Sequence, residues 1–438
     1  MKKFNIYIFI ALLLVGVSCE DRLDLLPPQD VDNSVALSTD ANVKAVLLGA
    51  YDALSIGDLF GGNTLRNSEL LGANDEIVFS GTFGDPADIW RKQITNINSD
   101  VTETWIEGYE VINICNNVLS ALDVVDEADR ALVEGEAKFI RGLMYFELVK
   151  FFGTPYSAGG ANSSLAIPIA ENPNSTEEYE KSSVEEVYQL VISDLTFAEN
   201  NLPSDNGTFA NRVAAAAVLS RVYLQQENFA GARDAANRGL NYATGVYSLV
   251  GNLAGVYNNT NNTSEDVFAI QVNTQDGVNN MQLFFASPTL GGRGDIEIQP
   301  SHFDIYEAND ERANLFYIDE ATDDIRTAKW TNQFGNVVLV RLAELYLTRA
   351  EGNVRLGQSV GDSPANDLNL LRQRAGLADV VSPTLADVLA ERNAELAFEG
   401  HKIHDIKRLQ LSTDGLPYDS DQLIFPIPQR EEGVNSNL

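Results

Sequence analysis

The chain has 438 residues, 44% of them hydrophobic and 21% charged, which is ordinary for a folded protein and long enough for two or three structural units. Acidic residues outnumber basic ones by 63 to 30, and the formal net charge at pH 7 is −33. A chain with this charge repels nucleic acid and anionic lipid surfaces, which argues against binding through a basic patch.

The first 18 residues have the pattern of a secretory signal peptide. A pair of lysines precedes an apolar run over residues 6–17, which is too short to span a bilayer as a folded helix. Cys19 follows at once, as in bacterial lipoprotein signals, although Gly16 stands where such signals usually have leucine. We therefore predict lipidation of Cys19 after cleavage; a disulfide with Cys115, the other cysteine and a candidate buried thiol, is the alternative.

A tether and one helix follow. Residues 19–38 contain two adjacent prolines and no hydrophobic period, which predicts a lipid-anchored tether. Thr39 is the expected N-cap of a helix that runs to about residue 54. In residues 55–100 no helical period survives, and glycines are interspersed with aromatic residues. A loop region of this length is unusual enough to indicate function.

Four helices are predicted next, at residues 102–122, 126–152, 183–200 and 209–226. Ser183 and Glu186 have the spacing of a capping box at the start of the third helix. Residues 216–239 fit the spacing of a tetratricopeptide unit, in which small residues let two helices approach closely, and residues 349–372 give a looser second unit. We expect these hairpins to stack against residues 102–152, because such repeats need neighbours for stability.

Residues 241–333 are rich in asparagine, glycine and threonine, and short strands are predicted at 267–272 and 281–286. Residues 334–438 return to helical periods at about 339–354, after Pro364, and from Thr384 to Gly400. Thr384 is the expected N-cap of the last of these helices, which ends where Gly400 can take the left-handed conformation. The sequence thus predicts a mainly α fold. A tetratricopeptide-like helical-repeat lobe, residues 39–240 with a loop insertion at 55–100, packs with a more irregular, loop-rich lobe containing a few short strands.

Several stretches carry a family resemblance, which is densest at the two ends of the mature chain. They include Glu-Arg-Asn-Ala-Glu-Leu-Ala-Phe-Glu-Gly-His at 391–401, Arg-Leu-Ala-Glu at 341–344, Arg-Ala-Glu at 349–351, Phe-Phe-Gly-Thr-Pro-Tyr at 151–156, Phe-Pro-Ile-Pro-Gln at 425–429 and Cys-Glu-Asp-Arg-Leu-Asp-Leu-Leu-Pro at 19–27. With them, the chain resembles the SusD/RagB family of surface glycan-binding lipoproteins. The chain stops at Leu438, short of the tail that this family usually carries.

The resemblance implies a complete working hypothesis. Residues 39–438 would form one SusD-like unit, with 241–333 on the ligand side and 334–438 returning to the helical lobe. The protein would be a cell-surface lipoprotein of the outer membrane that captures a glycan and closes as a lid over a SusC-like TonB-dependent transporter. Acidic residues 20 and 21 resemble the signal that sends such lipoproteins to the outer face. No cofactor and no enzymatic activity are implied.

Two histidines offer the strongest alternative to a binding function. His401 and His404 could hold a metal ion with a carboxylate, but Gly400 interrupts the continuous helix that a metallohydrolase motif requires. We therefore predict that they bond the end of a helix and hold no metal. The sequence also contains no Gly-x-Ser-x-Gly elbow and no phosphate-binding loop.

Three acids, Glu391, Glu395 and Glu399, lie on one face of the last predicted helix. A pair of catalytic carboxylates cannot be identified by spacing, since 63 acidic residues make any spacing available by chance. We predict that these three acids are buried structural partners of Arg392 or Arg408.

Glycan binding needs exposed aromatic faces and polar side chains on loops held by a rigid scaffold. Trp90 is equally consistent with a ligand platform and with packing under a loop, and packing is favoured for Trp330. A peptide-binding member of the same family and a helical-repeat glycoside hydrolase are the alternative functions. The candidate ligand-binding residues are Asn63, Arg66, Asp75, Phe83, Trp90 and Arg91 in the first loop region and Tyr306, Tyr317 and Trp330 in the second.

Overall fold

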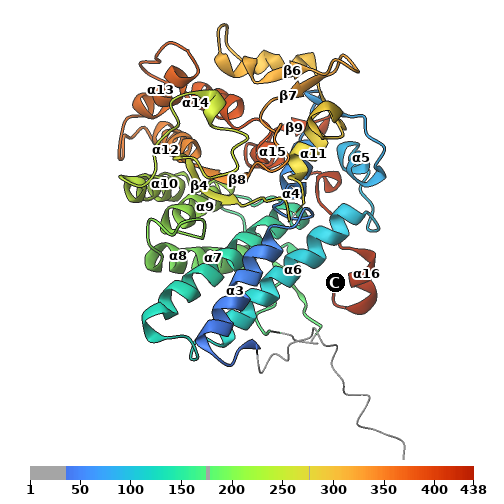
Figure 1. Ribbon diagram of the computed structural model, residues 1–438, viewed down its shortest axis with the longest axis vertical. Coiled ribbons are helices and arrows are strands. Elements are labelled where there is room, and N and C mark those ends of the chain that lie inside the picture. The colour runs from blue at the N-terminus through green and yellow to red at the C-terminus, as the bar shows by residue number, and fades with distance from the viewer. Residues whose placement is uncertain (1–35, 174–177, 276) are drawn as a thin grey trace, which may run out of the picture.

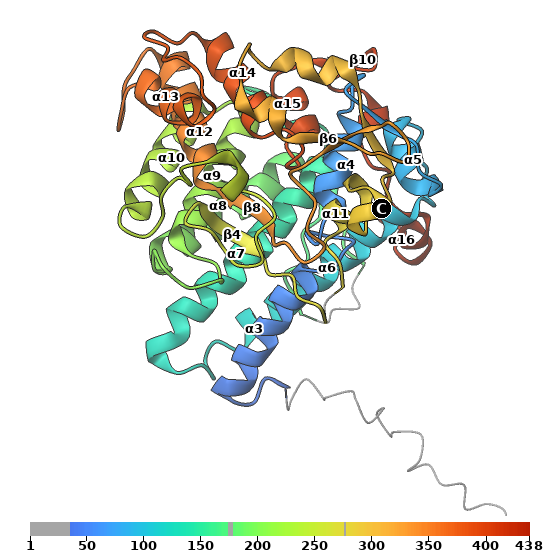
Figure 2. The same cartoon turned by 45° about the horizontal axis from the view of Figure 1, so that its top comes forward.

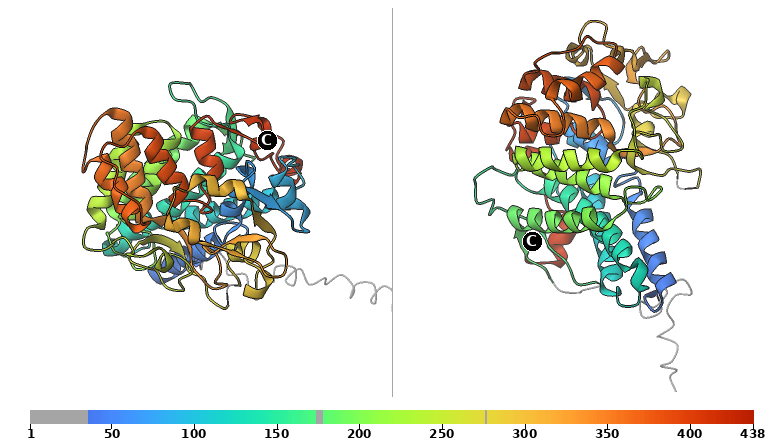
Figure 3. Two further views of the ribbon diagram at one scale, coloured as in Figure 1. Left: turned by 90° about the horizontal axis from the view of Figure 1, so that it is seen from above. Right: turned by 90° about the vertical axis from the view of Figure 1, so that its left-hand side faces the viewer.

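The computed structural model describes residues 36–173, 178–275 and 277–438 (Figure 1). Helices are stacked in layers, and short strands and loops gather on one side of the stack, as Figure 3 shows from the left-hand side of the first view. This arrangement confirms the predicted mainly α fold with a loop-rich part. The predicted signal peptide, Cys19 and most of the predicted tether lie outside the described residues.

The helical lobe begins as its caps predict. Helix α3 (Asp40–Leu54) starts at Thr39, whose side chain accepts a hydrogen bond from the Asn42 amide. Helix α8 (Val184–Asn201) starts with the predicted capping box of Ser183 and Glu186. The other helices of this lobe are α6 (Ser99–Ser120), α7 (Glu127–Phe152), α9 (Arg212–Gln225) and α10 (Phe229–Ala243). Within α6, Cys115 is a free, buried thiol, and burial raises its pKa.

Consecutive helices pack against one another from α6 to α10, and α12 (Leu342–Leu356) and α13 (Pro364–Arg374) extend the stack beyond α10 (Figure 2). The repeat hairpins therefore join residues 99–152 mainly through α8. Small residues permit the close spacing: a Cβ atom at Gly239 would lie 3.1 Å from Leu345 of α12 and 3.4 Å from Ala216 of α9.

The predicted secondary structure is wrong at residues 55–100 and at residues 281–286. The stretch 55–100 contains helices α4 (Asn63–Leu71) and α5 (Gly84–Trp90). Every residue of α4 is buried, so its sequence has no polar and apolar faces to reveal a helical period. Residues 281–286 belong to helix α11 (Asn280–Phe285), capped by Asn279, because a short apolar run fits a buried helix as well as a strand.

Some strands pair across large sequence distances. One antiparallel sheet has the order β1-β5-β7-β6, with β1 Ile77–Phe79, β5 Ile296–Ile298, β7 Ile325–Thr327 and β6 Phe316–Ile318. Strand β4 (Asp266–Ile270), close to its predicted position, pairs with β8 (Val337–Arg341). Residues 339–341, predicted as helix, are therefore strand, and α12 begins only at Leu342. The remaining elements are β2 (Leu165–Pro168), β3 (Lys181–Ser183), α14 (Leu385–Glu395), α15 (Lys402–Arg408), β9 (Ser412–Thr413), β10 (Leu416–Pro417), α16 (Gln429–Val434) and short 3-10 helices.

Buried ion pairs join the C-terminal helices to the strands. Glu395 contacts Arg341 (3.0 Å) and Arg374 (2.5 Å), and Glu391 contacts Arg312 (2.6 Å). The three acids singled out in the sequence are thus structural, as predicted. The predicted partners are wrong, however, because Arg392 and Arg408 instead hold Asp405 between them.

Candidate functional site

The two predicted loop regions meet beside the four-stranded sheet. Strand β1 pairs with β5 in register, Ile77 opposite Ile298 and Phe79 opposite Ile296. Beyond this pairing, the amide of Ser80 donates a hydrogen bond to the carbonyl oxygen of Asp295 (2.8 Å). Residues 80–83 are thereby held against residues 291–295, on the side of the molecule where α5 and α11 lie (Figure 1).

An exposed aromatic ring marks this junction. The side chain of Phe83 is 48% exposed, and the guanidinium carbon of Arg293 lies 4.1 Å from the centroid of its ring. The ring of Phe284 lies 6.2 Å from that of Phe83, on the side of the core. An exposed aromatic side chain beside an arginine combines an apolar surface with a hydrogen-bond donor, the two kinds of group that a sugar ring contacts.

Tyr317 belongs to the same face. Its hydroxyl accepts a hydrogen bond from the amide of Ser287 (2.9 Å), at the start of the loop that leads to Arg293. Leu290, in that loop, and Ile318, beside Tyr317, are 40% and 54% exposed. We call the surface formed by Thr82, Phe83 and Arg293, together with Tyr317, which bonds the same loop, the Phe83 face.

Three other predicted residues lie close to this face in the chain but have different surroundings. Trp90 is half-buried against the core, and its indole donates to the carbonyl oxygen of Ile77 (3.1 Å). Arg91 is half-exposed and pairs with Asp88 (3.4 Å). Asp75 is exposed just before β1, at the opposite end of that strand from Phe83.

Asn63, Arg66 and Trp330 are buried, which excludes direct ligand contact by these predicted residues in this structure. Arg66 is 1% exposed, pairs with Asp100 (2.5 Å) and stacks on Phe284 (4.1 Å). Asn63 donates to the Asp58 carboxylate, and the Trp330 indole donates to the carbonyl oxygen of Phe398 (2.8 Å). These buried polar side chains are hydrogen-bonded inside the protein, as buried polar groups usually are.

Tyr306 also has a packing role. Its hydroxyl lies 3.1 Å from Nε2 of the buried His302, whose Nδ1 lies 2.8 Å from the Glu76 carboxylate. Burial lowers the pKa of His302, so the neutral ring donates to Glu76 and accepts from Tyr306. This chain of bonds ties the segment after β5 to the segment before β1.

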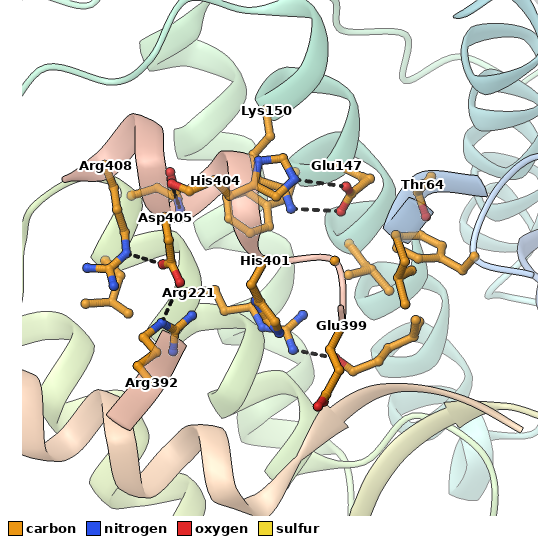
Figure 4. Close-up of a pocket in the computed structure, with 18 residues that line it drawn as sticks. Thr64, Glu147, Lys150, Arg221, Arg392, Glu399, His401, His404, Asp405 and Arg408 are labelled. Carbon is orange, nitrogen blue, oxygen red and sulfur yellow. Dashed lines mark hydrogen bonds and ion pairs between the residues drawn. The ribbon is translucent and has the colours of Figure 1, made fainter. Parts of the chain in front are cut away.

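The two histidines of the sequence alternative line an interior cavity of about 40 Å³ (Figure 4). This volume suits one or two water molecules and is far below that of a ligand pocket. Glu147 lies 3.6 Å from His404, and Arg392 and Arg408 both point at Asp405. In the described residues, no group of three His, Cys, Asp or Glu side chains could hold a metal ion.

Burial also fixes the protonation of these histidines. It lowers the pKa of His401 to about 3 and that of His404 to about 4, with further lowering by the nearby cations. Unfolded histidine has a pKa of about 6.5, so the unfolded chain binds more protons than the folded one below that pH. Both residues therefore cost stability progressively as the pH falls from 6.5 toward 4.

The variant His404→Gln removes one of these groups. Its free energy of unfolding, measured relative to that of the natural chain, is expected to rise by about 1 kcal/mol per pH unit as the pH falls from 6.5 to 4.5. Urea unfolding at several pH values measures this difference in unfolding free energy, which should not change with pH between 7.5 and 8.5. A difference that is constant from pH 8 to pH 4.5 would contradict the prediction.

Taken together, the stacked hairpins and the Phe83 face define a class: a helical-repeat protein with an exposed aromatic surface built from loops. Family models identify it further. Residues 21–224 match the family described as starch-binding and associating with the outer membrane, and residues 304–423 match the SusD family. The chain belongs to the SusD family.

Individual relatives agree along nearly the whole chain. SusD-like protein P2 of Formosa agariphila is 26% identical, with 100% of this chain and 99% of that protein covered. A putative sugar binding protein from Bacteroides vulgatus has a similar structure, with a TM-score of 0.83, 25% identity and coverage of 92% of this chain and 98% of its own. A SusD superfamily protein from Bacteroides thetaiotaomicron shares the fold, with a TM-score of 0.81, 23% identity and coverage of 91% and 98%.

Sequence reasoning missed Arg293 and Asp295. The signal for them was present as Gly-Gly-Arg-Gly-Asp at 291–295, an arginine between glycines in a strongly acidic chain. Of the predicted residues, Phe83 and Tyr317 both contact the 287–295 loop that carries this motif, Phe83 at Arg293 and Tyr317 at Ser287.

Proposed function

We propose that this protein captures a glycan at the cell surface and delivers it, unhydrolysed, to a SusC-like TonB-dependent transporter in the outer membrane. The observation that carries the proposal is the Phe83 face, an aromatic platform assembled from two distant loop regions on a SusD-family scaffold. Loops on a rigid scaffold are the usual place for recognition. The sugar-binding description of the B. vulgatus relative supports the ligand class.

The carboxylates near Phe83 favour binding over hydrolysis. Glycoside hydrolysis uses two carboxyl groups that flank the scissile bond, one of them protonated as an acid. Here Asp295 bonds Arg293, Asp88 pairs with Arg91, and Asp85 accepts a hydrogen bond from Ser99. Carboxylates engaged in this way are poor candidates for an acid and a nucleophile.

The test compares ligand classes directly. Purified protein without its signal peptide is applied to a glycan array and to a peptide array, and bound polysaccharides are then assayed for new reducing ends. Binding to glycans without new reducing ends is expected. Binding to peptides alone would favour the peptide-binding alternative, and reducing ends formed at enzyme-like rates would overturn the proposal in favour of a hydrolase. Co-purification with a TonB-dependent transporter from the native membrane tests delivery.

The lipid anchor gives a separate prediction. None of the helices in residues 36–173, 178–275 and 277–438 combines the length and apolar character that a membrane crossing requires. We expect Cys19→Ala to release the protein into the soluble fraction, because lipidation of Cys19 would be its membrane attachment. Fractionation of cells expressing either form measures this, and Cys115→Ala is the control that should stay membrane-bound. Membrane association of the Cys19→Ala form would contradict lipidation.

A further inference from the structure

Arg293 is held in place far more firmly than an ordinary surface arginine. Its backbone amide donates to the carbonyl oxygen of Leu283 (2.7 Å), and the amide of Asp295 donates to that of Phe284 (2.9 Å). Both acceptors lie in helix α11. The loop that carries Arg293 is therefore bonded to a packed helix on one side and to Ser80 on the other.

The side chain is restrained on three sides. Its Nε donates to the Asp295 carboxylate (2.6 Å), its Nη2 donates to the Thr82 hydroxyl (3.3 Å), and its plane stacks on Phe83. The Asp295 side chain is only 7% exposed, whereas that of Arg293 is 32% exposed. A buried carboxylate thus holds a guanidinium that still reaches the surface.

Glycines make this arrangement possible. A Cβ atom at Gly81 would lie 2.4 Å from the Asp295 side chain, and one at Gly292 would lie 2.2 Å from the carbonyl oxygen of Ala286. Both distances are too short for any side chain, so glycine at 81 lets the two loops approach and glycine at 292 lets the second loop fold back on Ala286. Gly294 has a φ of 63°, which also favours glycine, so both glycines beside Arg293 are accounted for.

One donor group remains for a ligand. Within the part of the chain that the structure describes, Nη1 of Arg293 has no hydrogen-bond partner, and nearly half of the Phe83 side chain is in contact with solvent. An arginine fixed in advance loses little rotamer freedom when it binds, so its hydrogen bond to a ligand is worth more than that of a free side chain.

The charges around Arg293 and on the whole chain indicate which kind of ligand atom accepts a hydrogen bond from Nη1. The cations along this side are already matched with carboxylates: Arg293 with Asp295, and Arg91 with Asp88. The chain as a whole carries −33 charges, which repels anionic ligands. A hydroxyl oxygen of an uncharged sugar accepts a hydrogen bond from Arg293 without meeting this repulsion.

We propose that Arg293, positioned by Asp295, is the specificity-determining residue of the Phe83 face, and that it donates to a hydroxyl of an uncharged sugar ring stacked beside Phe83. The proposal rests on the proposed glycan-binding function and adds the ligand's charge class and the residue that selects it. Asp295 is a positioning residue, because its carboxylate orients the guanidinium and offsets its charge.

Affinity electrophoresis in gels containing starch, dextran, xylan, polygalacturonate or sulfated dextran tests the proposal on the purified protein. The natural chain is expected to be retarded by uncharged polysaccharides only. Arg293→Lys keeps the charge but not the planar fork, and it should weaken that binding about tenfold to a hundredfold, the effect of losing a hydrogen bond from a charged donor. Arg355→Lys is the matched control in the helical lobe: Arg355 also stacks on a phenylalanine and pairs with a carboxylate, and this variant should bind within about twofold of the natural chain.

Two further variants separate positioning from mere stability. In Phe83→Ala/Arg293→Lys, binding should be no weaker than in Phe83→Ala alone, because both side chains act on one sugar ring. Asp295→Asn should weaken binding to the uncharged polysaccharide and add retardation by polygalacturonate, because it removes the charge that offsets Arg293. A purely structural Asp295 would not change the preference between charge classes.

The outcomes distinguish the two proposals. Retardation of the natural chain mainly by polygalacturonate or sulfated dextran, or natural binding by Arg293→Lys, would overturn the role of Arg293 while leaving glycan binding intact. No retardation by any polysaccharide, together with binding to the peptide array, would overturn the proposed function itself and the role of Arg293 with it.

Discussion

Replacing Arg341 by methionine is expected to lower the free energy of unfolding by about 3–5 kcal/mol, the usual cost of breaking a buried ion pair by removing one partner. Arg341 is 3% exposed, and its guanidinium contacts Glu265 (2.8 Å), Glu395 (3.0 Å) and Glu399 (2.7 Å). Neighbouring cations hold the pKa of Glu395 well below its usual range. The variant would therefore leave three buried carboxylates with too little compensating charge.

Urea unfolding followed by far-ultraviolet circular dichroism measures the loss. Lys44→Met is the matched control, because Lys44 pairs with Asp40 and Asp129 near the surface, where its side chain is 34% exposed. Such exposed pairs contribute about 0–1 kcal/mol. If Arg341→Met costs no more than Lys44→Met, the buried network does not stabilise the fold as argued.

Replacing Phe83 by alanine is expected to weaken glycan binding about thirtyfold or more, since removing a central aromatic contact typically costs about 2 kcal/mol of binding free energy. Phe83 is 48% exposed, so the same change should alter the unfolding free energy little. Isothermal titration with the polysaccharide selected by the glycan array measures the affinity.

A matched control is available in the helical lobe. Phe209 is 37% exposed and contacts Tyr51 edge-on, with ring centroids 5.0 Å apart. Phe209→Ala should leave glycan affinity unchanged. If the Phe83→Ala protein binds the glycan as tightly as the natural chain, the ligand does not bind at the Phe83 face.

Local signals were enough to predict much of the helical lobe. Thr39, Ser183 and Thr384 all cap helices as predicted, because an N-cap needs only a side-chain oxygen and the amides two or three residues on. Gly400 takes the predicted left-handed conformation, with φ 84°, but α14 ends before it, at Glu395, so the predicted end of this helix is wrong. The amide of Gly400 bonds Glu69, a partner that lies 331 residues earlier in the chain.

Local sequence signals could not show which polar residues are exposed, because tertiary contacts determine their burial. Arg66 and Asn63 look like loop-borne ligand contacts in the sequence, but they lie in a helix that is buried on every side. The candidate site shows the same limit. Phe83 could be proposed from its glycine-rich surroundings. Arg293 could not, because it lies over the Phe83 ring only as a result of the pairing of β1 with β5. The helical and strand periods of the sequence carry no information about this contact between Arg293 and Phe83.

The position of helix α15 has a consequence for the order in which the chain folds. Lys407 of α15 donates to the carbonyl oxygen of Lys150 in α7, 257 residues earlier, and His404 of α15 lies 3.6 Å from Glu147, which is also in α7. Contacts between such distant segments form late, since the intervening chain must first be drawn together. The contacts that Glu147 and the Lys150 carbonyl of α7 make with α15 therefore form only after nearly the last segment of the chain has joined the fold.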